Sequence, residues 1–379
     1  MSGGMTVRTV AAGAVPAGAV AACGCAAVPA ADAAAGASGI HALTGELGGA
    51  LETILRAFQV TRAVLPSAAV GLVDQQLRTV TDFAVGRRLY RRSVADLPHA
   101  RKVPADAFLD LLIGDAFATT VCRALHLLPG QTSCYAAAVK YLVPELFREA
   151  VDSLGVVLGA RSFLREGRHA IFQKHARDLP VASLVHAGGT VCQATVIPQL
   201  PRLARNGWLR DEPAPAELFH LAGPLPELDF DRLATTAGRT DPLLAVLPAA
   251  AERFRDEPEL GPLCRRLLDE VTALKGLVDA LPPRDRTPLA GPVSFELAHR
   301  YALLLAAAAC LGVWQANPDN PSAFLRGPEW LVAALGRLTA RLGCPPVAGA
   351  REAEESVVTE LVRRYEECIA FDLIGRRLA

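Results

Sequence analysis

The chain has 379 residues, enough for two domains with a sizeable buried core. Its 39 basic and 39 acidic residues give a formal net charge of zero, which excludes the basic excess typical of nucleic-acid-binding proteins. Hydrophobic residues make up 51% of the sequence and aromatic residues only 6%. Alanine contributes much of the apolar fraction, and because alanine is the strongest helix former, the composition favours closely packed helices.

The nine cysteines are scattered along the chain. Cys23 and Cys25 form the one close pair, and no second pair completes a zinc site, so we expect no metal centre. We interpret the cysteines as reduced core residues of a cytoplasmic protein. The apolar stretch Tyr301–Trp314 is too short to span a bilayer, which predicts a buried core helix and no membrane association.

Residues 1–42 are rich in alanine and glycine, and we expect a disordered leader there. A secretion signal is the alternative, because Arg8 precedes a long apolar stretch. From Gly45 onward the pattern becomes helical. An apolar stripe at helical spacing predicts one face of the first helix that packs into a core: Leu47, Leu51, Ile54, Leu55 and Phe58.

Residues 43–208 are predicted to form an up-and-down bundle of four long helices, because the connections are short and marked by proline or glycine. The predicted helices run over residues 45–88 with a kink at Pro66, 104–128, 132–158 and 188–206.

Residues 209–230 are rich in proline and acidic residues and are predicted to be a linker. Residues 231–379 are predicted to be a helical extension. Its expected helices cover residues 241–256, 258–280, 291–315, 327–342 and 351–376. No segment alternates as a strand, so the predicted fold class is all-α, a four-helix bundle followed by a second helical region.

Generic catalytic motifs are missing from the sequence: there is no Walker loop, no G-x-G-x-x-G after a strand, no H-E-x-x-H and no G-x-S-x-G. Three short segments stand out instead, in the order FQVTR (58–62), RRLY (87–90), and LREG (164–167) leading to HAGGTVCQATVIPQL (186–200). Their order and spacing over residues 45–205 resemble the C-terminal helical domain of the acyl-CoA dehydrogenases.

This resemblance implies an FAD-dependent α,β-dehydrogenation of an acyl thioester, in which a carboxylate removes the α-proton and the flavin takes the β-hydride. By position, Arg62 corresponds to an arginine near the acyl-CoA site, and Arg87 to the arginine that pairs with the flavin pyrophosphate. Gln193 corresponds to a glutamine that contacts FAD, and Gly159 to a glycine that lets the backbone approach the cofactor.

The catalytic glutamate of the resembled family has no counterpart. Its two alternative positions hold Thr61 on the first helix and, depending on alignment, Val191 or Cys192 near the last helix, so the base is unidentified. The turn glycine is replaced by Arg91. The family's N-terminal helical domain and middle β-domain also have no counterpart before Gly45.

Two hypotheses follow. The chain is a component of a flavin-dependent oxidoreductase that acts on an acyl-CoA, with FAD bound at a junction with a second copy or with a polypeptide that supplies the missing domains. Alternatively, it is a non-enzymatic helical scaffold derived from that family. Self-association through the bundle is expected under either hypothesis.

Overall fold

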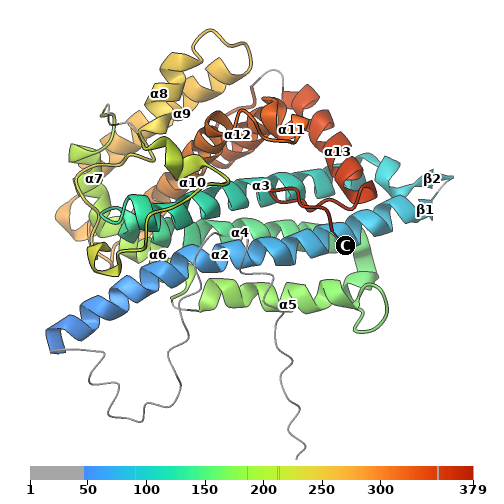
Figure 1. The fold of residues 1–379 in the computed structure, drawn as a ribbon, viewed down its shortest axis with the longest axis horizontal. Helices are drawn as coiled ribbons and strands as arrows, with labels where there is room; N and C mark the ends of the chain where they lie inside the picture. Colours follow the sequence, from blue (N-terminus) through green and yellow to red (C-terminus); the bar gives the residue numbers. More distant parts are fainter. Residues whose placement is uncertain are drawn as a thin grey trace, which may run out of the picture.

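The computed structural model describes residues 47–89, 91–185, 187–210, 212, 214–347 and 350–378 (Figure 1). The predicted leader, with Cys23 and Cys25, lies outside these residues, as does Tyr90 of the RRLY segment. Helices dominate the described part, which confirms the all-α fold class. The first helices are α2 (Leu47–Gly86), α3 (Pro98–Leu127), α4 (Thr132–Leu158), α5 (Ala170–Leu184), α6 (Gly189–Val196) and α7 (Leu200–Asn206).

Helices α2, α3 and α4 pack against one another, α5 lies along α2 and α4, and α6 covers the start of α4 (Figure 1). The predicted bounds of α4 are confirmed at both ends. The predicted start of the second helix at Pro104 is wrong, because the helix begins at Pro98. Proline suits the first turn of a helix, where its missing N–H costs no hydrogen bond, so Pro98 is the better start signal.

The prediction of one continuous last helix over residues 188–206 is also wrong. The segment is divided into α6, a 3₁₀ turn (Ile197–Gln199) and α7, because Pro198 and Pro201 cannot donate the backbone hydrogen bonds of a regular helix. Helix α5 was not predicted at all. It contains Pro180, and only Phe172 and Leu179 are fully buried, so its apolar face is narrow.

A short antiparallel ribbon joins α2 to α3. Strand β1 (Arg88–Leu89) pairs with β2 (Arg92–Ser93) across a tight turn, and a 3₁₀ turn (Val94–Asp96) leads into α3. Arg91 in this turn has a φ of 65°, in the left-handed region that favours glycine. The described part of the chain contains no other two-residue or longer strand.

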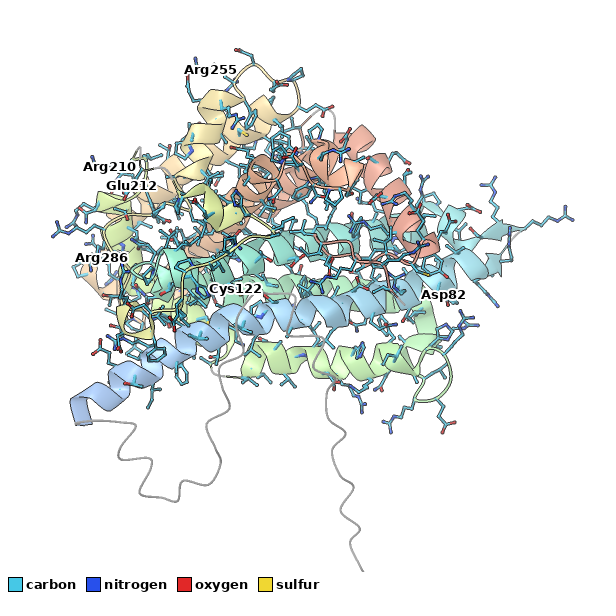
Figure 2. All side chains as sticks on the ribbon, in the orientation of Figure 1. Asp82, Cys122, Arg210, Glu212, Arg255 and Arg286 are labelled. Atoms are coloured by element: carbon cyan, nitrogen blue, oxygen red, sulfur yellow. The ribbon has the colours of Figure 1, made fainter. Side chains whose placement is uncertain are left out.

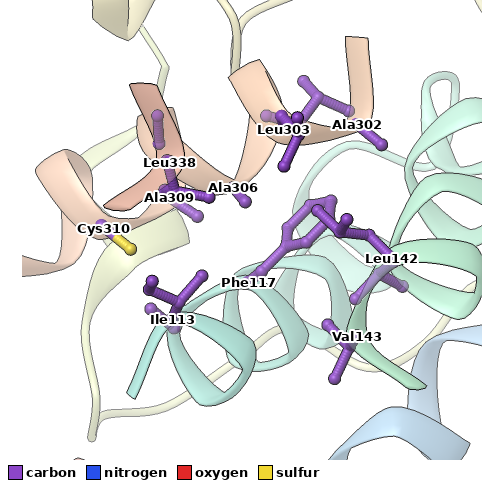
Figure 3. Packing of buried hydrophobic residues seen from close by; sticks show 14 of the residues in the cluster. Ile113, Phe117, Leu142, Val143, Ala302, Leu303, Ala306, Ala309, Cys310 and Leu338 are labelled. Carbon is purple, nitrogen blue, oxygen red and sulfur yellow. The ribbon is translucent and has the colours of Figure 1, made fainter. Parts of the chain in front are cut away.

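The second helical region covers one side of the bundle (Figure 1). It consists of α8 (Val246–Arg253), α9 (Leu260–Asp279), α10 (Pro292–Ala316), α11 (Ala323–Arg326), α12 (Glu329–Arg341) and α13 (Ala350–Glu366), with a 3₁₀ turn at Pro283–Asp285. Side chains of α3, α4, α10 and α12 interlock in one continuous core (Figure 3). The small residues of α10, among them Ala302, Ala306 and Ala309, let the neighbouring helices approach closely.

By length and composition alone, two stretches could cross a membrane, Ala170–Asn206 and Pro292–Ala316. In the second stretch, which is α10, 83% of the most apolar window is buried inside the protein. This burial is what the sequence predicted for Tyr301–Trp314. The first stretch spans three separate helices and includes residue 186, which lies outside the described part.

The last predicted helix extends too far. It ends at Glu366 rather than near residue 376, because the chain turns at Cys368, whose φ is 54°. The residues that follow Cys368 form a C-terminal clasp over α2 and α3. Asp74 of α2 accepts the N–H of Phe371 at 2.5 Å, and Asp115 of α3 accepts the N–H of Leu373 at 2.8 Å. The buried Arg364 donates to the carbonyls of residues 370 and 372, so the clasp is held from both sides.

The proline-rich segment 209–230 packs onto the core. A 3₁₀ turn (Ala216–Phe219) inserts Leu218 and Phe219 into the continuous core, where the Phe219 ring lies against Gly312 of α10. A second 3₁₀ turn covers Phe230–Arg232. Beyond it, the buried carboxylate of Asp241 accepts hydrogen bonds from side chains of α4, α10 and the turn after α7.

Asp241 accepts four hydrogen bonds and is almost completely buried. The hydroxyls of Tyr135 and Tyr301 each donate to it at 2.7 Å, the Trp208 indole donates at 3.0 Å, and the backbone N–H of Leu244 donates at 3.3 Å. Burial raises the pKa of Asp241, and the donated hydrogen bonds act against this rise. No cation pairs with this carboxylate in the described structure, so neutral donors alone stabilise it.

The predicted core stripe of α2 is only partly a core face. Leu51 is 63% exposed, and Ile54 and Leu55 are also exposed, whereas one face of the same helix is buried further along, at Val73, Leu77 and other positions. Helix α2 extends past the end of the bundle (Figure 1), and no other described element covers the apolar side chains of its first turns. The stripe was correctly predicted as apolar, but its burial was wrong.

Candidate functional site

Arg62 lies on α2, close to Lys140 of α4 and Cys192 of α6, at the end of the bundle where α2 protrudes. Arg62 is 7% exposed, and Lys140 and Cys192 are completely buried. The Lys140 ammonium donates to two carbonyl oxygens at the end of α5, those of Ala182 and Ser183. Burial lowers the pKa of Lys140; Cys192 opposes this and Arg62 adds to it.

The two positions that correspond to the family glutamate supply no carboxylate here. Thr61 turns its hydroxyl back to the carbonyl of Phe58 at 3.1 Å, and Val191 is 52% exposed. Burial raises the pKa of the Cys192 thiol, although Arg62 and Lys140 both act to lower it. The arrangement is a buried cationic cluster beside a thiol.

Gln193 follows Cys192 but is turned toward the second helical region. Its side-chain amide donates to the carbonyl of Phe295 at 3.1 Å, which ties α6 to α10. Gln193 also lines a hollow of about 510 Å³ that contains a hydrogen-bonded pair, the Tyr141 hydroxyl and His299 Nδ1 at 3.0 Å. Burial raises the pKa of Tyr141 to about 12 and lowers that of His299, so the protonated phenol can donate to the neutral imidazole.

Arg87 lies at the opposite end of α2, where the ribbon begins. Its side chain is exposed and makes no ion pair within the described residues, and the same holds for Arg88, Arg91 and Arg92. Long nitrogen-tipped side chains project from this end of the bundle, beyond Asp82 (Figure 2). Four neighbouring guanidinium groups make this ribbon a strongly basic surface.

Gly159 ends α4 at the same end as Arg87. It has a φ of 59°, and a side chain at this position would meet nothing within 4 Å, so the backbone is open to approach. Two residues further on, the Arg161 guanidinium lies 5.1 Å from the centre of the Phe83 ring of α2. The arginine ribbon and Gly159 therefore form one surface.

The sequence-predicted site residues fall into two groups that one chain does not bring together. Arg87 and Gly159 lie at the ribbon end, whereas Arg62, Thr61 and residues 191–193 lie at the protruding end. Arg62 and Arg87 are 25 positions apart along α2. At the helical rise per residue this corresponds to roughly 38 Å.

Sequence reasoning missed Lys140, Tyr141 and His299. A signal for Lys140 existed, since it is the one charge in the apolar run YAAAVKYLV, and such a residue requires a specific partner. The Tyr141–His299 pair had no local signal, because the two residues are 158 positions apart.

Comparison with known proteins identifies the class of the first helical region. Residues 49–195 match the profile of the acyl-CoA dehydrogenase C-terminal domain. The matched segment includes both groups of predicted site residues. No curated protein matches the sequence.

Three solved structures share the fold at low sequence identity. An FAD-complexed acyl-CoA dehydrogenase from Bacillus anthracis aligns with a TM-score of 0.55 at 10% identity over 82% of this chain and 56% of its own. Caenorhabditis elegans ACDH-11 in complex with C11-CoA gives 0.54 at 11% identity over 81% and 47%. Arabidopsis thaliana acyl-CoA oxidase 1 gives 0.54 at 12% identity over 84% and 50%.

These alignments cover far more of the chain than residues 49–195, so the similarity of fold extends into the second helical region. The chain spans about half the length of these solved structures.

Proposed function

We propose that this chain is the helical component of a flavin-dependent oxidoreductase of the acyl-CoA dehydrogenase type, acting on an acyl thioester together with a further polypeptide or a second copy. The observation that carries the proposal is the arginine ribbon at one end of the acyl-CoA dehydrogenase domain. Its guanidinium groups are exposed and make no ion pairs in the described structure. Such groups bind phosphate oxygens through charge-assisted hydrogen bonds.

The residues at the ribbon end fit the phosphates of a dinucleotide cofactor. Arg87 would pair with the pyrophosphate, and the open backbone at Gly159 would admit the cofactor closely. The strained φ of Arg91 supports a functional ribbon, because strain of about 1–2 kcal/mol is retained where the residue has a use. A bound flavin would supply the hydride acceptor for the dehydrogenation.

The residues at the protruding end fit the expected flavin and substrate contacts less well. The Gln193 amide is already used to hold α10, and Thr61, Val191 and Cys192 provide no carboxylate base. The two ends are also too far apart to serve the same reacting atoms within one chain. These features support the part of the proposal that requires a second chain to complete the site.

The test is flavin uptake by the full chain. We would purify the chain alone and co-expressed with the product of its neighbouring gene, add FAD, and record the visible absorbance after gel filtration. Two results together would support the proposal: FAD elutes with the protein, and the amount bound falls at least about tenfold in Arg87→Ala. A drop of this size is expected because a lost charge-assisted contact is worth about 1.5–3 kcal/mol. Arg284→Ala, which changes an exposed arginine far from the ribbon, is the matched control.

The second candidate function is a non-enzymatic helical scaffold. The lack of a carboxylate at Thr61, Val191 and Cys192 favours it, because the dehydrogenation requires a base. A protein that stays colourless in both preparations would refute the enzyme proposal and favour the scaffold function. A cytoplasmic location belongs to the proposal as well, and it is supported by the seven described cysteines, all of which are free.

A further inference from the structure

Arg62 is a nearly buried cation that has no counter-ion among the described residues. Its Nε is buried without a hydrogen-bond partner, and no ion pair of Arg62 occurs in the described structure. Its described contact is a cation–π interaction, with the guanidinium 5.8 Å from the centre of the Phe58 ring. An unpaired buried charge costs several kcal/mol of folding free energy, so its retention indicates a use outside the folded chain.

The neighbours of Arg62 add to the positive charge around it. Lys140 adds a second positive charge, and its ammonium is already satisfied by the carbonyls at the end of α5. Cys192 is the third member of the cluster, and burial raises its pKa, so it remains a neutral thiol near pH 7. No anion of the described residues pairs with the cluster, so its net positive charge is available to an external anion.

Exposed apolar side chains lie on the elements that carry or contact this cluster, and together we call them the apolar rim. They come from three elements: the protruding turns of α2, the end of α5 and the start of α6. The members are Leu51, Ile54, Leu55, Val181, Leu184 and Val191, with exposed fractions from 39% to 70%. On α2 the rim continues the stripe that is buried further along the helix. An arginine enclosed by apolar residues is the typical composition of a protein–protein hot spot.

The shape and charge of this surface restrict what can cover it. Arg62 lines none of four hollows of about 430–610 Å³ in the described part of the chain, and small ligands prefer concave sites. A two-fold contact between two copies through the rim would place the same cations opposite each other, and the carboxylate on this part of α2, Glu52, is already paired with Arg56 at 2.7 Å.

We infer that the apolar rim and Arg62 form a docking surface for a different polypeptide, one that presents an apolar segment with a single carboxylate side chain to Arg62. This inference rests on the proposed requirement for a further polypeptide and identifies its chemistry. The carboxylate pairs with the guanidinium, and the apolar segment covers the protruding face of α2.

The first test measures the stability of the full chain without a partner. Arg62→Met removes the unpaired charge and keeps most of the volume, so we expect Tm to rise by about 1–3 °C. Arg364→Met is the matched control, because Arg364 is also buried but bonds to Glu360 and two carbonyls, and its loss should lower Tm. A fall in Tm for Arg62→Met similar to that of Arg364→Met would show that Arg62 is structural and overturn the inference.

The second test identifies the occupant. A photo-crosslinking amino acid replaces Leu55 in the rim or, as control, the exposed Leu277 of α9, and crosslinks are mapped in the cells that produce the protein. We expect the probe at position 55 to label one other polypeptide at a segment containing Asp or Glu. Adding Arg62→Met should reduce the yield about tenfold or more.

Three outcomes would overturn the inference: position 55 labels nothing beyond position 277, the crosslink joins two copies or lies within one chain, or its yield survives Arg62→Met. Neither test measures flavin. A colourless protein with an Arg62-dependent crosslink would refute the proposed enzyme but support the docking surface. Flavin uptake without that crosslink would support the proposed enzyme but refute the docking surface.

Discussion

Replacing Asp241 by alanine should remove a large part of the stability of the folded chain. The change leaves the hydroxyls of Tyr135 and Tyr301 and the indole N–H of Trp208 without their acceptor in a fully buried site. Each unsatisfied buried donor costs about 1–3 kcal/mol. Removal of the carboxylate also relieves its own desolvation, so we expect a net loss of about 3–5 kcal/mol, a large share of the 5–15 kcal/mol typical of folded proteins.

The assay is urea unfolding followed by circular dichroism, with the midpoint and slope fitted for each variant. Asp241→Asn keeps an acceptor oxygen and the volume, so it should cost less than the alanine variant. Tyr301→Phe removes a single donor and should cost about 1–2 kcal/mol. An Asp241→Ala midpoint that corresponds to a loss under about 1 kcal/mol would refute the reasoning, because the donors would then have found other partners.

Two further predictions concern packing and pH. Gly312→Ala should lower the free energy of unfolding by about 1–3 kcal/mol, because the added methyl group would overlap the Phe219 ring. Gly276→Ala, which has open space around it, should leave the stability unchanged or raise it. Equal unfolding midpoints for the two variants would contradict this prediction. Burial raises the pKa of Asp115 to about 7, so the folded state holds a proton that the unfolded state loses near pH 4, and stability falls as pH rises from about 4 to 7. Compared with Asp115→Asn, the wild type should lose about 2–4 kcal/mol over this range, and parallel curves of stability against pH would rule the mechanism out.

Much of the bundle could be predicted from the sequence because its signals are local. The Pro129-Gly130 turn, the long apolar periodicity and the glycine at residue 159 define α4 within its own segment. Helix α5 and the end of α13 could not be predicted in this way. Helix α5 has a narrow apolar face, and α13 stops because buried Arg364 captures carbonyls six and eight residues further on.

The candidate site was less predictable than the fold, for a physical reason. Periodicity shows which face of a helix is apolar, but whether another element covers that face depends on where the bundle ends. The exposure of Leu51 and the burial of Arg62 on the same helix face therefore appear only in three dimensions. The same applies to Asp241, whose two tyrosine donors come from helices 166 positions apart in the chain.

The C-terminal clasp has a consequence for how the chain folds during synthesis. Asp74 and Asp115 leave the ribosome long before residues 371 and 373, whose amide groups they hold. Until residues 371 and 373 have been made, the carboxylates of Asp74 and Asp115 lack these hydrogen-bond donors. Contacts that join such distant positions form late, so α2 and α3 gain the cover of the clasp only after residues 371 and 373 have been made.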